Sequence, residues 1–273
     1  MTIKTRRLSH MGLSDTLSLN DGQQIPVMGF GTAELEGEEA EKSVADAIEL
    51  GYRLIDTSPN YGNEVEVGNG IQTALDGKVK REDLFISTKV ESENMSTEGV
   101  KKSVDESLDR LKLDYIDLLL IHSPADDDAI NVDTWNGMKA VSDSGKVKSI
   151  GVSNFTQADL EPVLSNGNTK PSINQVELAL ANVDWDTKTF CEDESIIIMA
   201  YSPLKKGALD SEIITNLADK YNKTPQQIAL RWAMDINTIP IPRSGNRDHI
   251  IANAAVFDFK LIEDEIKQIN ELT

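Results

Sequence analysis

The sequence has few of the features that mark secreted or membrane proteins. Its 273 residues include one cysteine, Cys191, which excludes an internal disulfide and a CxxC metal or redox motif. No apolar run approaches the ~20 residues that a membrane helix needs. Residues 1–13 contain Lys4, Arg6 and Arg7 but lack the apolar segment of a secretory signal. We therefore expect a cytoplasmic protein, with residues 1–13 as a flexible tail and residues 14–273 as a single domain.

Basic residues are also in short supply. The chain has 27 lysines and arginines against 46 aspartates and glutamates, so its formal net charge is −19 at pH 7. A surface of this kind repels phosphate backbones, which argues against a nucleic-acid partner. The simplest interpretation of the charge is a well-solvated shell.

Two nucleotide-binding signatures are missing as well. Gly29-Phe30-Gly31 stops short of a Gly-x-Gly-x-x-Gly motif, and no Gly-x-x-x-x-Gly-Lys-Ser/Thr motif is present. A dinucleotide, if the chain binds one, is therefore not held by a Rossmann unit.

Short apolar runs alternate with amphipathic segments along the chain. The runs are four to seven residues long, as is typical of strands buried on both faces of a parallel sheet. They are Val27–Phe30, Tyr52–Ile55, Leu84–Ser87, Tyr115–Ile121, Val147–Val152, Ser172–Val176, Ser195–Ala200 and Thr238–Ile241. Eight strands alternating with helices predict an α/β fold, a (β/α)₈ TIM barrel, with a doubly wound sheet as the alternative.

Three segments allow more detailed predictions. Thr97–Leu111 has apolar residues at helical spacing on one face, which predicts an amphipathic helix. Thr224-Pro225-Gln226-Gln227 combines an N-cap threonine, a first-turn proline and a glutamine at the third position, which predicts a helix start. Leu17–Val27 predicts a β-hairpin with its turn at Asn20-Asp21-Gly22, placed as a plug at the bottom of the barrel.

Titratable side chains stand at or near the ends of three successive predicted strands. Asp56 ends the second strand and Tyr61 follows it, Lys89 ends the third and His122 ends the fourth. In a barrel these ends meet at one mouth, where active sites form. This set suits carbonyl reduction, which adds a hydride to carbon and a proton to oxygen. Tyr61 would donate the proton, with its pKa lowered by the Lys89 ammonium, Asp56 would hold Lys89, and His122 would polarise the carbonyl.

Each of these residues has an ordinary structural interpretation when taken alone. Asp56 can cap the turn at Thr57-Ser58-Pro59. Lys89 can be a solvated lysine at a strand end, Tyr61 can pack in a loop, and His122 can be a hydrogen-bonded core histidine. The joint placement at one mouth favours the catalytic interpretation.

Six motifs, in order and at similar spacing, resemble those of the aldo-keto reductases, and the match as a whole runs from about Leu17 to the C-terminus. They are Gly51-Tyr-Arg-Leu-Ile-Asp56-Thr-Ser-Pro-Asn-Tyr61-Gly-Asn-Glu64-Val-Glu-Val-Gly68, Leu84-Phe-Ile-Ser-Thr-Lys89, Leu118-Leu-Leu-Ile-His122, Ile150-Gly-Val-Ser153-Asn154-Phe155, Asn174-Gln175-Val-Glu177-Leu and Ile241-Pro-Arg243-Ser244. The chain looks most similar to bacterial diketogluconate and methylglyoxal reductases. The resemblance implies a monomeric NAD(P)H-dependent enzyme that acts on small carbonyl substrates and needs no metal.

The resemblance also implies residue roles. Tyr61, Asp56, Lys89 and His122 would form the catalytic set already derived. Ser153, Asn154 and Gln175 would bind the nicotinamide carboxamide, Tyr201 would stack on the ring, and Ser202 and Leu204 would line the pyrophosphate channel. The full set implied for the cofactor is Gly31, Thr32, Asp56, Ser153, Asn154, Gln175, Tyr201, Ser202, Leu204, Arg243, Ser244, His249 and Asn253.

The cofactor end departs from the family pattern. The family motif resembles Ile-Pro-Lys-Ser, then an arginine that holds the adenosine 2′-phosphate, then an asparagine. Here the lysine is Arg243, still a good phosphate ligand, and the arginine is His249, which is mostly neutral at pH 7. Arg247 is a second cation two residues away from His249. We expect NADPH as the cofactor, with NADH as the alternative.

The substrate side departs too. Glu91 and Ser123 stand where many relatives carry tryptophan, and aromatic residues make up only 5% of the chain. A more polar or wider pocket is expected, which favours α-keto aldehydes, keto-sugar acids and short aldehydes. Lys205 and Lys206 replace a common Gly-Arg pair, and they either lie near the cofactor phosphates or face solvent.

Two other functional classes fit parts of the pattern. A regulatory barrel would keep the nicotinamide site with little turnover. A barrel lyase would use Lys89 as a Schiff-base nucleophile, which requires an unpaired, desolvated amine.

Overall fold

Eight parallel strands form a single closed ring. The computed structural model describes residues 12–167, 169–205 and 207–272. The strand order is β10-β9-β8-β7-β6-β5-β4-β3. The backbone N–H of Gly31 donates to Pro242 O at 3.1 Å and joins the first strand to the last. The strands are β3 (Gly29–Gly31), β4 (Leu54–Asp56), β5 (Phe85–Val90), β6 (Ile116–Ile121), β7 (Val147–Ser153), β8 (Ile173–Glu177), β9 (Ile197–Tyr201) and β10 (Thr238–Pro240).

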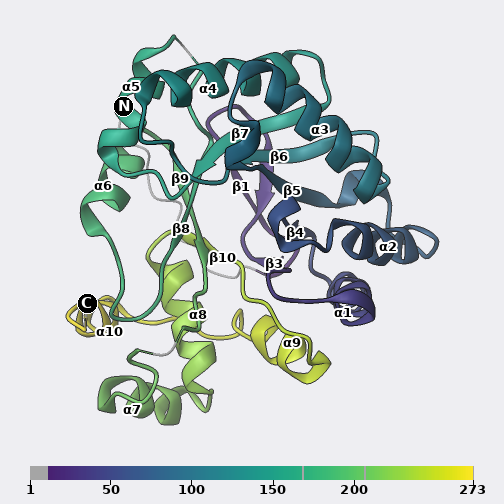
Figure 1. Cartoon of the computed structure of the whole chain (residues 1–273). Helices are drawn as coiled ribbons and strands as arrows, with labels where there is room; N and C mark the ends of the chain where they lie inside the picture. The colour runs from purple at the N-terminus through teal and green to yellow at the C-terminus, as the bar shows by residue number, and fades with distance from the viewer. Residues whose placement is uncertain (1–11, 168, 206, 273) are drawn as a thin grey trace.

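Helices surround this ring on its outside (Figure 1). They are α1 (Gly37–Glu49), α2 (Glu64–Leu75), α3 (Thr97–Leu111), α4 (Asp128–Asp143), α5 (Gln157–Ser165), α6 (Trp185–Asp193), α7 (Glu212–Tyr221), α8 (Pro225–Asp235), α9 (Arg247–Ala254) and α10 (Glu263–Asn270), with short 3₁₀ turns η1 (Pro59–Tyr61), η2 (Arg81–Asp83) and η3 (Ser92–Asn94). The predicted (β/α)₈ barrel is confirmed, and the doubly wound alternative is wrong because the sheet closes on itself.

The local predictions for two helices are also confirmed. Helix α3 spans Thr97–Leu111, and Val100, Val104 and Leu111 on its apolar face are buried. Helix α8 begins at Pro225, where Thr224 and Gln227 form a reciprocal capping box. Within the described ranges, no helix is long and apolar enough to cross a membrane.

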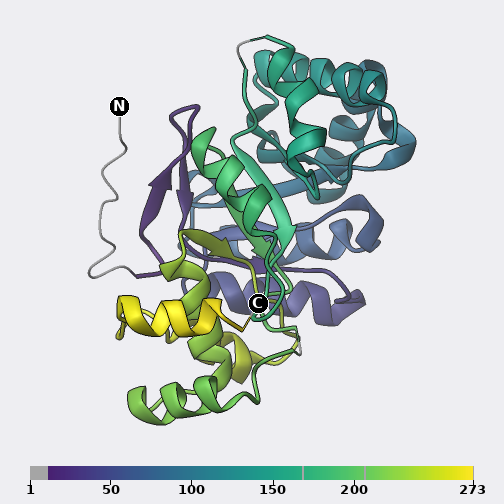
Figure 2. The same ribbon diagram turned by 90° about the vertical axis from the view of Figure 1, so that its left-hand side faces the viewer.

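The N-terminal hairpin covers one end of the barrel. Strands β1 (Thr16–Ser18) and β2 (Gln24–Pro26) pair antiparallel, and Gly22 in the turn has a left-handed φ of 92°. The Asn20 amide donates to the carbonyls of Pro171 and Ser195, just before β8 and β9 begin. The hairpin lies outside the ring (Figure 2) and closes the end where the strands start, as predicted. Most of the tail predicted for residues 1–13 lies outside the described residues.

The interior of the barrel is apolar near the hairpin and polar at the opposite end. Leu19 and Ile25 of the hairpin pack with Leu54, Phe85 and Ile239 in one buried cluster. Larger apolar clusters fill the layer between strands and helices. The buried charged groups Asp56 and Lys89 stand instead where β4 and β5 end. This arrangement leaves the carboxyl ends of the strands as the place for polar chemistry.

The close contact between α1 and α2 gives a stability prediction. A Cβ added at Gly70 would lie 2.5 Å from Glu41 O and 2.9 Å from Val44 Cβ, so the two helices would have to separate. We expect Gly70→Ala to lower the free energy of unfolding by about 1–3 kcal/mol, as overpacking does, despite alanine's better helix propensity. Urea denaturation measures this change. Gly12→Ala is the control, since a Cβ there meets nothing within 4 Å, and equal stability of both variants would contradict the close contact.

Candidate active site

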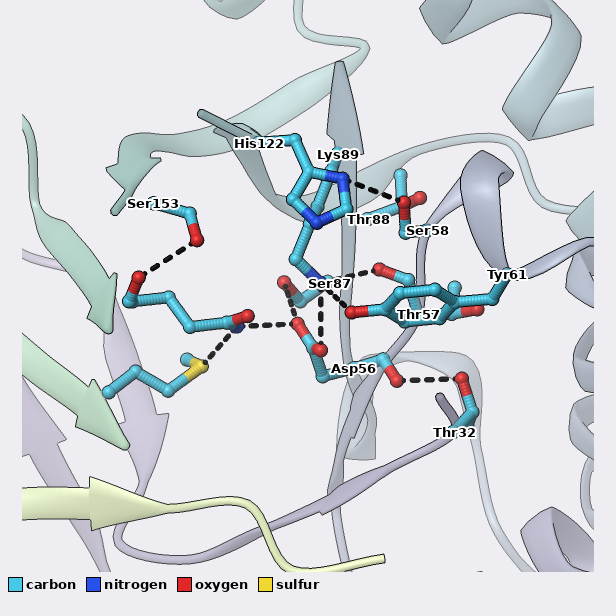
Figure 3. Close-up of polar contacts among 12 residues, drawn as sticks. Thr32, Asp56, Thr57, Ser58, Tyr61, Ser87, Thr88, Lys89, His122 and Ser153 are labelled. Atoms are coloured by element: carbon cyan, nitrogen blue, oxygen red, sulfur yellow. Dashed lines mark hydrogen bonds and ion pairs between the residues drawn. The ribbon is translucent and has the colours of Figure 1, made fainter. Parts of the chain in front are cut away.

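The four residues predicted to be catalytic converge at one mouth of the barrel. Lys89, at the end of β5, is the centre of the group (Figure 3). Its Nζ atom donates to Asp56 Oδ2 at 2.9 Å, to the Thr57 carbonyl at 2.9 Å and to Tyr61 Oη at 3.2 Å. The Tyr61 ring meets the His122 ring edge to face, with 6.0 Å between ring centroids.

The Asp56–Lys89 ion pair is fully enclosed by polar partners. The two residues are 2% and 0% exposed. Asp56 Oδ1 accepts hydrogen bonds from Ser87 Oγ at 3.0 Å and from Gln175 Nε2 at 2.8 Å. Buried ions are tolerated only when their remaining hydrogen-bonding capacity is satisfied in this way.

Lys89 is held as an ammonium. Burial by itself lowers the pKa of Lys89, but the neighbouring Asp56 carboxylate and the Tyr61 phenol outweigh burial and raise it above its ordinary value. An amine that is charged and hydrogen-bonded to three oxygens is a poor nucleophile. The geometry therefore argues against the Schiff-base lyase.

The expected pKa shift of Tyr61 is wrong in its net direction. Burial is the largest influence and raises the pKa of Tyr61, while the Lys89 ammonium lowers it by a smaller amount. The negative charges of Asp56 and Glu91 raise it further. Lys89 does act on Tyr61 as expected, but the phenol keeps its proton at neutral pH because the site is enclosed and anionic.

His122 has a carboxylate partner that sequence reasoning missed. Its Nδ1 atom lies 2.8 Å from both Glu91 oxygens and 3.3 Å from Ser58 Oγ, and the contact with Ser58 is drawn in Figure 3. The Ser58 hydroxyl also donates to Glu91. A signal was available, since Glu91 already stood out as replacing an aromatic residue, but nothing in the sequence placed its carboxylate against a ring 31 residues away.

A cavity of about 540 Å³ opens beside Tyr61 and His122. The predicted site residues that line it are Gly31, Thr32, Asp56, Tyr61, His122, Ser153, Asn154, Gln175, Tyr201, Ser202, Leu204 and Arg243. Lys89 lies beneath them with no exposed surface. Thr32 is held by its hydroxyl, which donates to the Asp56 carbonyl at 2.9 Å.

The ends of β7 and β9 form one wall of this cavity. The Tyr201 hydroxyl donates to Asn154 Oδ1 at 3.0 Å, and the Ser153 hydroxyl donates to the Gln175 carbonyl at 2.8 Å. Asn154 and Ser202 have left-handed φ angles of 61° and 51°. Such a conformation is costly for serine, and strain of this kind collects at binding sites.

Two cations line the cavity, and each is paired with a carboxylate. Arg243 contacts the Glu34 carboxylate, and Lys205 Nζ donates to both Glu177 oxygens at 2.8 and 2.9 Å. The structure thus places Lys205 in the cavity wall, while Lys206 lies outside the described residues. Sequence reasoning did not single out Glu34.

The last predicted cofactor residues lie beyond this cavity. Ser244 and Asn253 are buried and His249 is exposed, and none of the three lines the cavity. Arg247 forms ion pairs with Asp46 and Glu49 of α1. Its guanidinium is therefore engaged by two carboxylates of α1 in this structure.

The donors in this cavity suit a nicotinamide dinucleotide. Side-chain amides and hydroxyls at the β7, β8 and β9 ends match the needs of a carboxamide, and Arg243 and Lys205 match those of phosphates. In the described part of the chain, no cluster of His, Cys, Asp and Glu side chains is able to hold a metal ion.

The sequence matches the model of the aldo/keto reductase family over residues 27–273. The chain belongs to the aldo/keto reductase family. A glyoxal reductase of Bacillus subtilis is 40% identical over 262 residues, which cover 95% of this chain and 93% of that protein. An aldo-keto reductase of a Mycobacterium species is also 40% identical, covering 94% of this chain and 90% of that protein.

Solved structures agree with this assignment. The crystal structure of an aldo/keto reductase from Brucella melitensis superposes with a TM-score of 0.91 at 36% identity, over 95% of this chain and all of that chain. The structure of a Bombyx mori aldo-keto reductase in complex with NADP superposes with a TM-score of 0.90 at 37% identity, over 96% and 94% of the two chains. This aldo-keto reductase is an NAD(P)H-dependent oxidoreductase on a TIM barrel.

The buried ion pair gives a second prediction. Lys89→Met leaves Asp56 as an uncompensated buried charge, so we expect the free energy of unfolding to fall by about 3–5 kcal/mol. The double variant Asp56→Asn/Lys89→Met removes both charges and recovers a large part of this loss. Denaturant titration of the unchanged protein, the single variant and the double variant measures these free energies. The control is Lys101→Met, because the exposed ion pair between Lys101 and Glu98 contributes little to stability. If Lys89→Met lowers the free energy of unfolding as little as this control does, the interior tolerates the lone Asp56 carboxylate and the prediction is wrong.

Proposed function

We propose that this aldo-keto reductase reduces small polar carbonyl compounds to alcohols with NADPH as the hydride donor. The observation that carries the proposal is the hydrogen-bonded chain from Asp56 through Lys89 to Tyr61, which ends at the wall of a cavity rich in amide and hydroxyl donors. The family assignment supports the reaction type, and the similarity to a glyoxal reductase of Bacillus subtilis supports an α-dicarbonyl substrate.

The cofactor would be held along the cavity wall. We assign Ser153, Asn154 and Gln175 to the carboxamide and Tyr201 to the face of the nicotinamide ring. Gly31, Thr32 and Asp56 would border the nicotinamide end, while Ser202, Leu204, Arg243, Ser244, His249 and Asn253 would serve the phosphate and adenosine end. Bound NADPH supplies the hydride that the carbonyl carbon accepts.

Tyr61 would supply the proton. Its raised pKa means that the phenol enters the reaction protonated, and the Lys89 ammonium 3.2 Å away stabilises the phenolate that proton donation leaves behind. Asp56 keeps Lys89 in place and charged. His122, whose ring lies beside that of Tyr61, would orient the carbonyl oxygen.

The substrates would be small and polar. Glu91 and Ser123 border a cavity beside His122 where many relatives carry tryptophan, so bulky apolar substrates lose their aromatic walls. This supports α-keto aldehydes, keto-sugar acids and short aldehydes. A cytoplasmic location, a single-domain chain and a monomeric state stay predictions from the sequence.

A reduced-nicotinamide absorbance assay tests the function directly. NADPH and NADH are supplied separately with methylglyoxal and a panel of short aldehydes. We expect oxidation of NADPH that depends on the carbonyl. Cofactor binding without turnover on any carbonyl would favour the regulatory barrel, and a steep preference for bulky steroids over methylglyoxal would refute the substrate class.

The proton donor is tested by Tyr61→Phe. This change removes the phenolic hydroxyl and little else, so we expect kcat/KM to fall by about 10²–10⁴-fold, the usual contribution of general acid catalysis. NADPH affinity, measured by fluorescence titration, should stay within about twofold. Tyr115→Phe is the control, because that ring packs on Arg81 and Lys148 away from the cavity. Full turnover by Tyr61→Phe would remove the residue from the mechanism.

Cofactor choice is tested by His249→Arg. The added guanidinium would form a charge-assisted hydrogen bond with the 2′-phosphate, and Arg247 is occupied by α1. We expect NADPH to bind more tightly relative to NADH by about 1.5–3 kcal/mol. Dissociation constants for the two cofactors measure the ratio, and His249→Gln serves as the uncharged control. An unchanged ratio in the arginine variant would mean that position 249 does not face the 2′-phosphate.

A further inference from the structure

Glu91 lies where β5 gives way to the loop at the mouth of the barrel. Glu91 is 7% exposed. Three hydrogen-bond donors surround its carboxylate. Both oxygens lie 2.8 Å from His122 Nδ1, the Ser58 hydroxyl donates to Oε1, and the Asn60 N–H donates to Oε1 at 3.2 Å. A carboxylate with this many donors is stabilised in its ionised form.

The charge of Glu91 fixes which nitrogen of His122 carries a proton. Burial alone raises the pKa of Glu91, but the hydrogen bonds from His122 and Ser58 outweigh it and bring the pKa below its ordinary value. An ionised carboxylate has only acceptors, so the Nδ1 atom that faces it must be a donor. The other ring nitrogen, Nε2, points toward the Lys89 and Tyr61 side of the site (Figure 3). Nε2 therefore donates to a carbonyl only when the ring is doubly protonated.

A second cavity of about 380 Å³ also has His122 in its wall. The two cavities share His122 in their walls, so a substrate whose carbonyl lies at Tyr61 and His122 has its remaining atoms next to the second cavity. Its polar lining is made by Asn60, Glu91, Ser92 and Ser123. No lysine or arginine lines it among the described residues, and the loop continues from Ala125 into three successive aspartates, Asp126 to Asp128.

We propose that Glu91 is a positioning and specificity-determining residue, which holds His122 with Nδ1 protonated and makes the adjoining cavity a subsite for the neutral, hydroxyl-bearing end of a carbonyl substrate. The serine hydroxyls and the Asn60 amide there match hydroxyl or hydrated aldehyde groups. A substrate carboxylate there meets a buried like charge and no lysine or arginine among the described lining residues. The proposal rests on the proposed function and narrows it: neutral α-keto aldehydes and hydroxy aldehydes are preferred, and keto-sugar acids become poor substrates.

A matched pair of substrates tests the charge selection. Succinic semialdehyde and its methyl ester present the same aldehyde with and without a negative charge. We expect the unchanged enzyme to favour the ester. Glu91→Gln keeps the shape of the side chain and removes its charge. We expect it to lower the ester-to-acid ratio of kcat/KM by about tenfold, as is usual for like charges within several ångströms of each other. The change should come from the KM of the acid. The kcat for the ester should change several-fold, because the proton of His122 is no longer held on Nδ1 by a carboxylate.

Glu98→Gln is the matched control. It removes the same charge seven residues away, on an exposed side chain that pairs with Lys101 and lines neither cavity. The control should leave the ratio and the kcat for the ester unchanged. An equal fall in both variants would overturn the proposal in favour of a general surface-charge effect, and an unchanged ratio in Glu91→Gln would overturn it outright.

Nitrogen-15 NMR of the histidine rings tests the pairing without any turnover. The chain has three histidines, so the signals of His122 can be assigned. At a pH where the ring is neutral, we expect the proton on Nδ1 in the unchanged protein and a shift of population toward Nε2 in Glu91→Gln. A proton on Nε2 in the unchanged protein would overturn the pairing. If the pairing is present and neither aldehyde is reduced, the proposed function fails while the Glu91–His122 geometry stands.

Discussion

The buried ion pair between Asp56 and Lys89 is the constraint on which the rest of the site depends. Two full charges at the end of an apolar barrel are stable only because every remaining polar atom near them has a partner: Ser87 and Gln175 on the carboxylate, and the Thr57 carbonyl and Tyr61 on the ammonium. Those partners come from several different strands and turns. The pair therefore ties these strand ends together and holds Tyr61, the proposed proton donor, at the wall of the cavity.

The two cavities that share His122 are electrostatically different. In the first cavity, Arg243 and Lys205 provide positive charge, although Glu34 and Glu177 pair with them in this structure. In the second, Glu91 provides a buried negative charge, and no lysine or arginine lines it among the described residues. Under the proposed function this division separates a polyanionic cofactor from a neutral substrate, because an anion that fits the first cavity is repelled from the second.

Much of the architecture could be predicted from the sequence because its signals are local. The eight apolar runs each overlap a barrel strand, although most of these strands extend past the end of the predicted run. Thr224-Pro225 and Thr97–Leu111 mark helices by caps and periodicity that involve neighbours along the chain. The convergence of Asp56, Lys89 and His122 also followed, since strand ends in a barrel meet by construction. The pKa of Tyr61 did not follow, because its direction depends on how deeply the ring is buried, and burial is a sum over the whole mouth.

The sequence by itself determined the barrel, the hairpin that closes its lower end, the four residues proposed to be catalytic and the polar residues at two positions where many relatives carry tryptophan. Those properties depend on spacing, local hydrogen bonding and residue type. Only the tertiary structure decided that Glu91 contacts His122, that Arg247 pairs with α1 instead of standing free near His249, and that Lys205 lies in the cavity wall. Each of these is a contact between charged groups on different elements, and such contacts are set by the packing that brings those elements together.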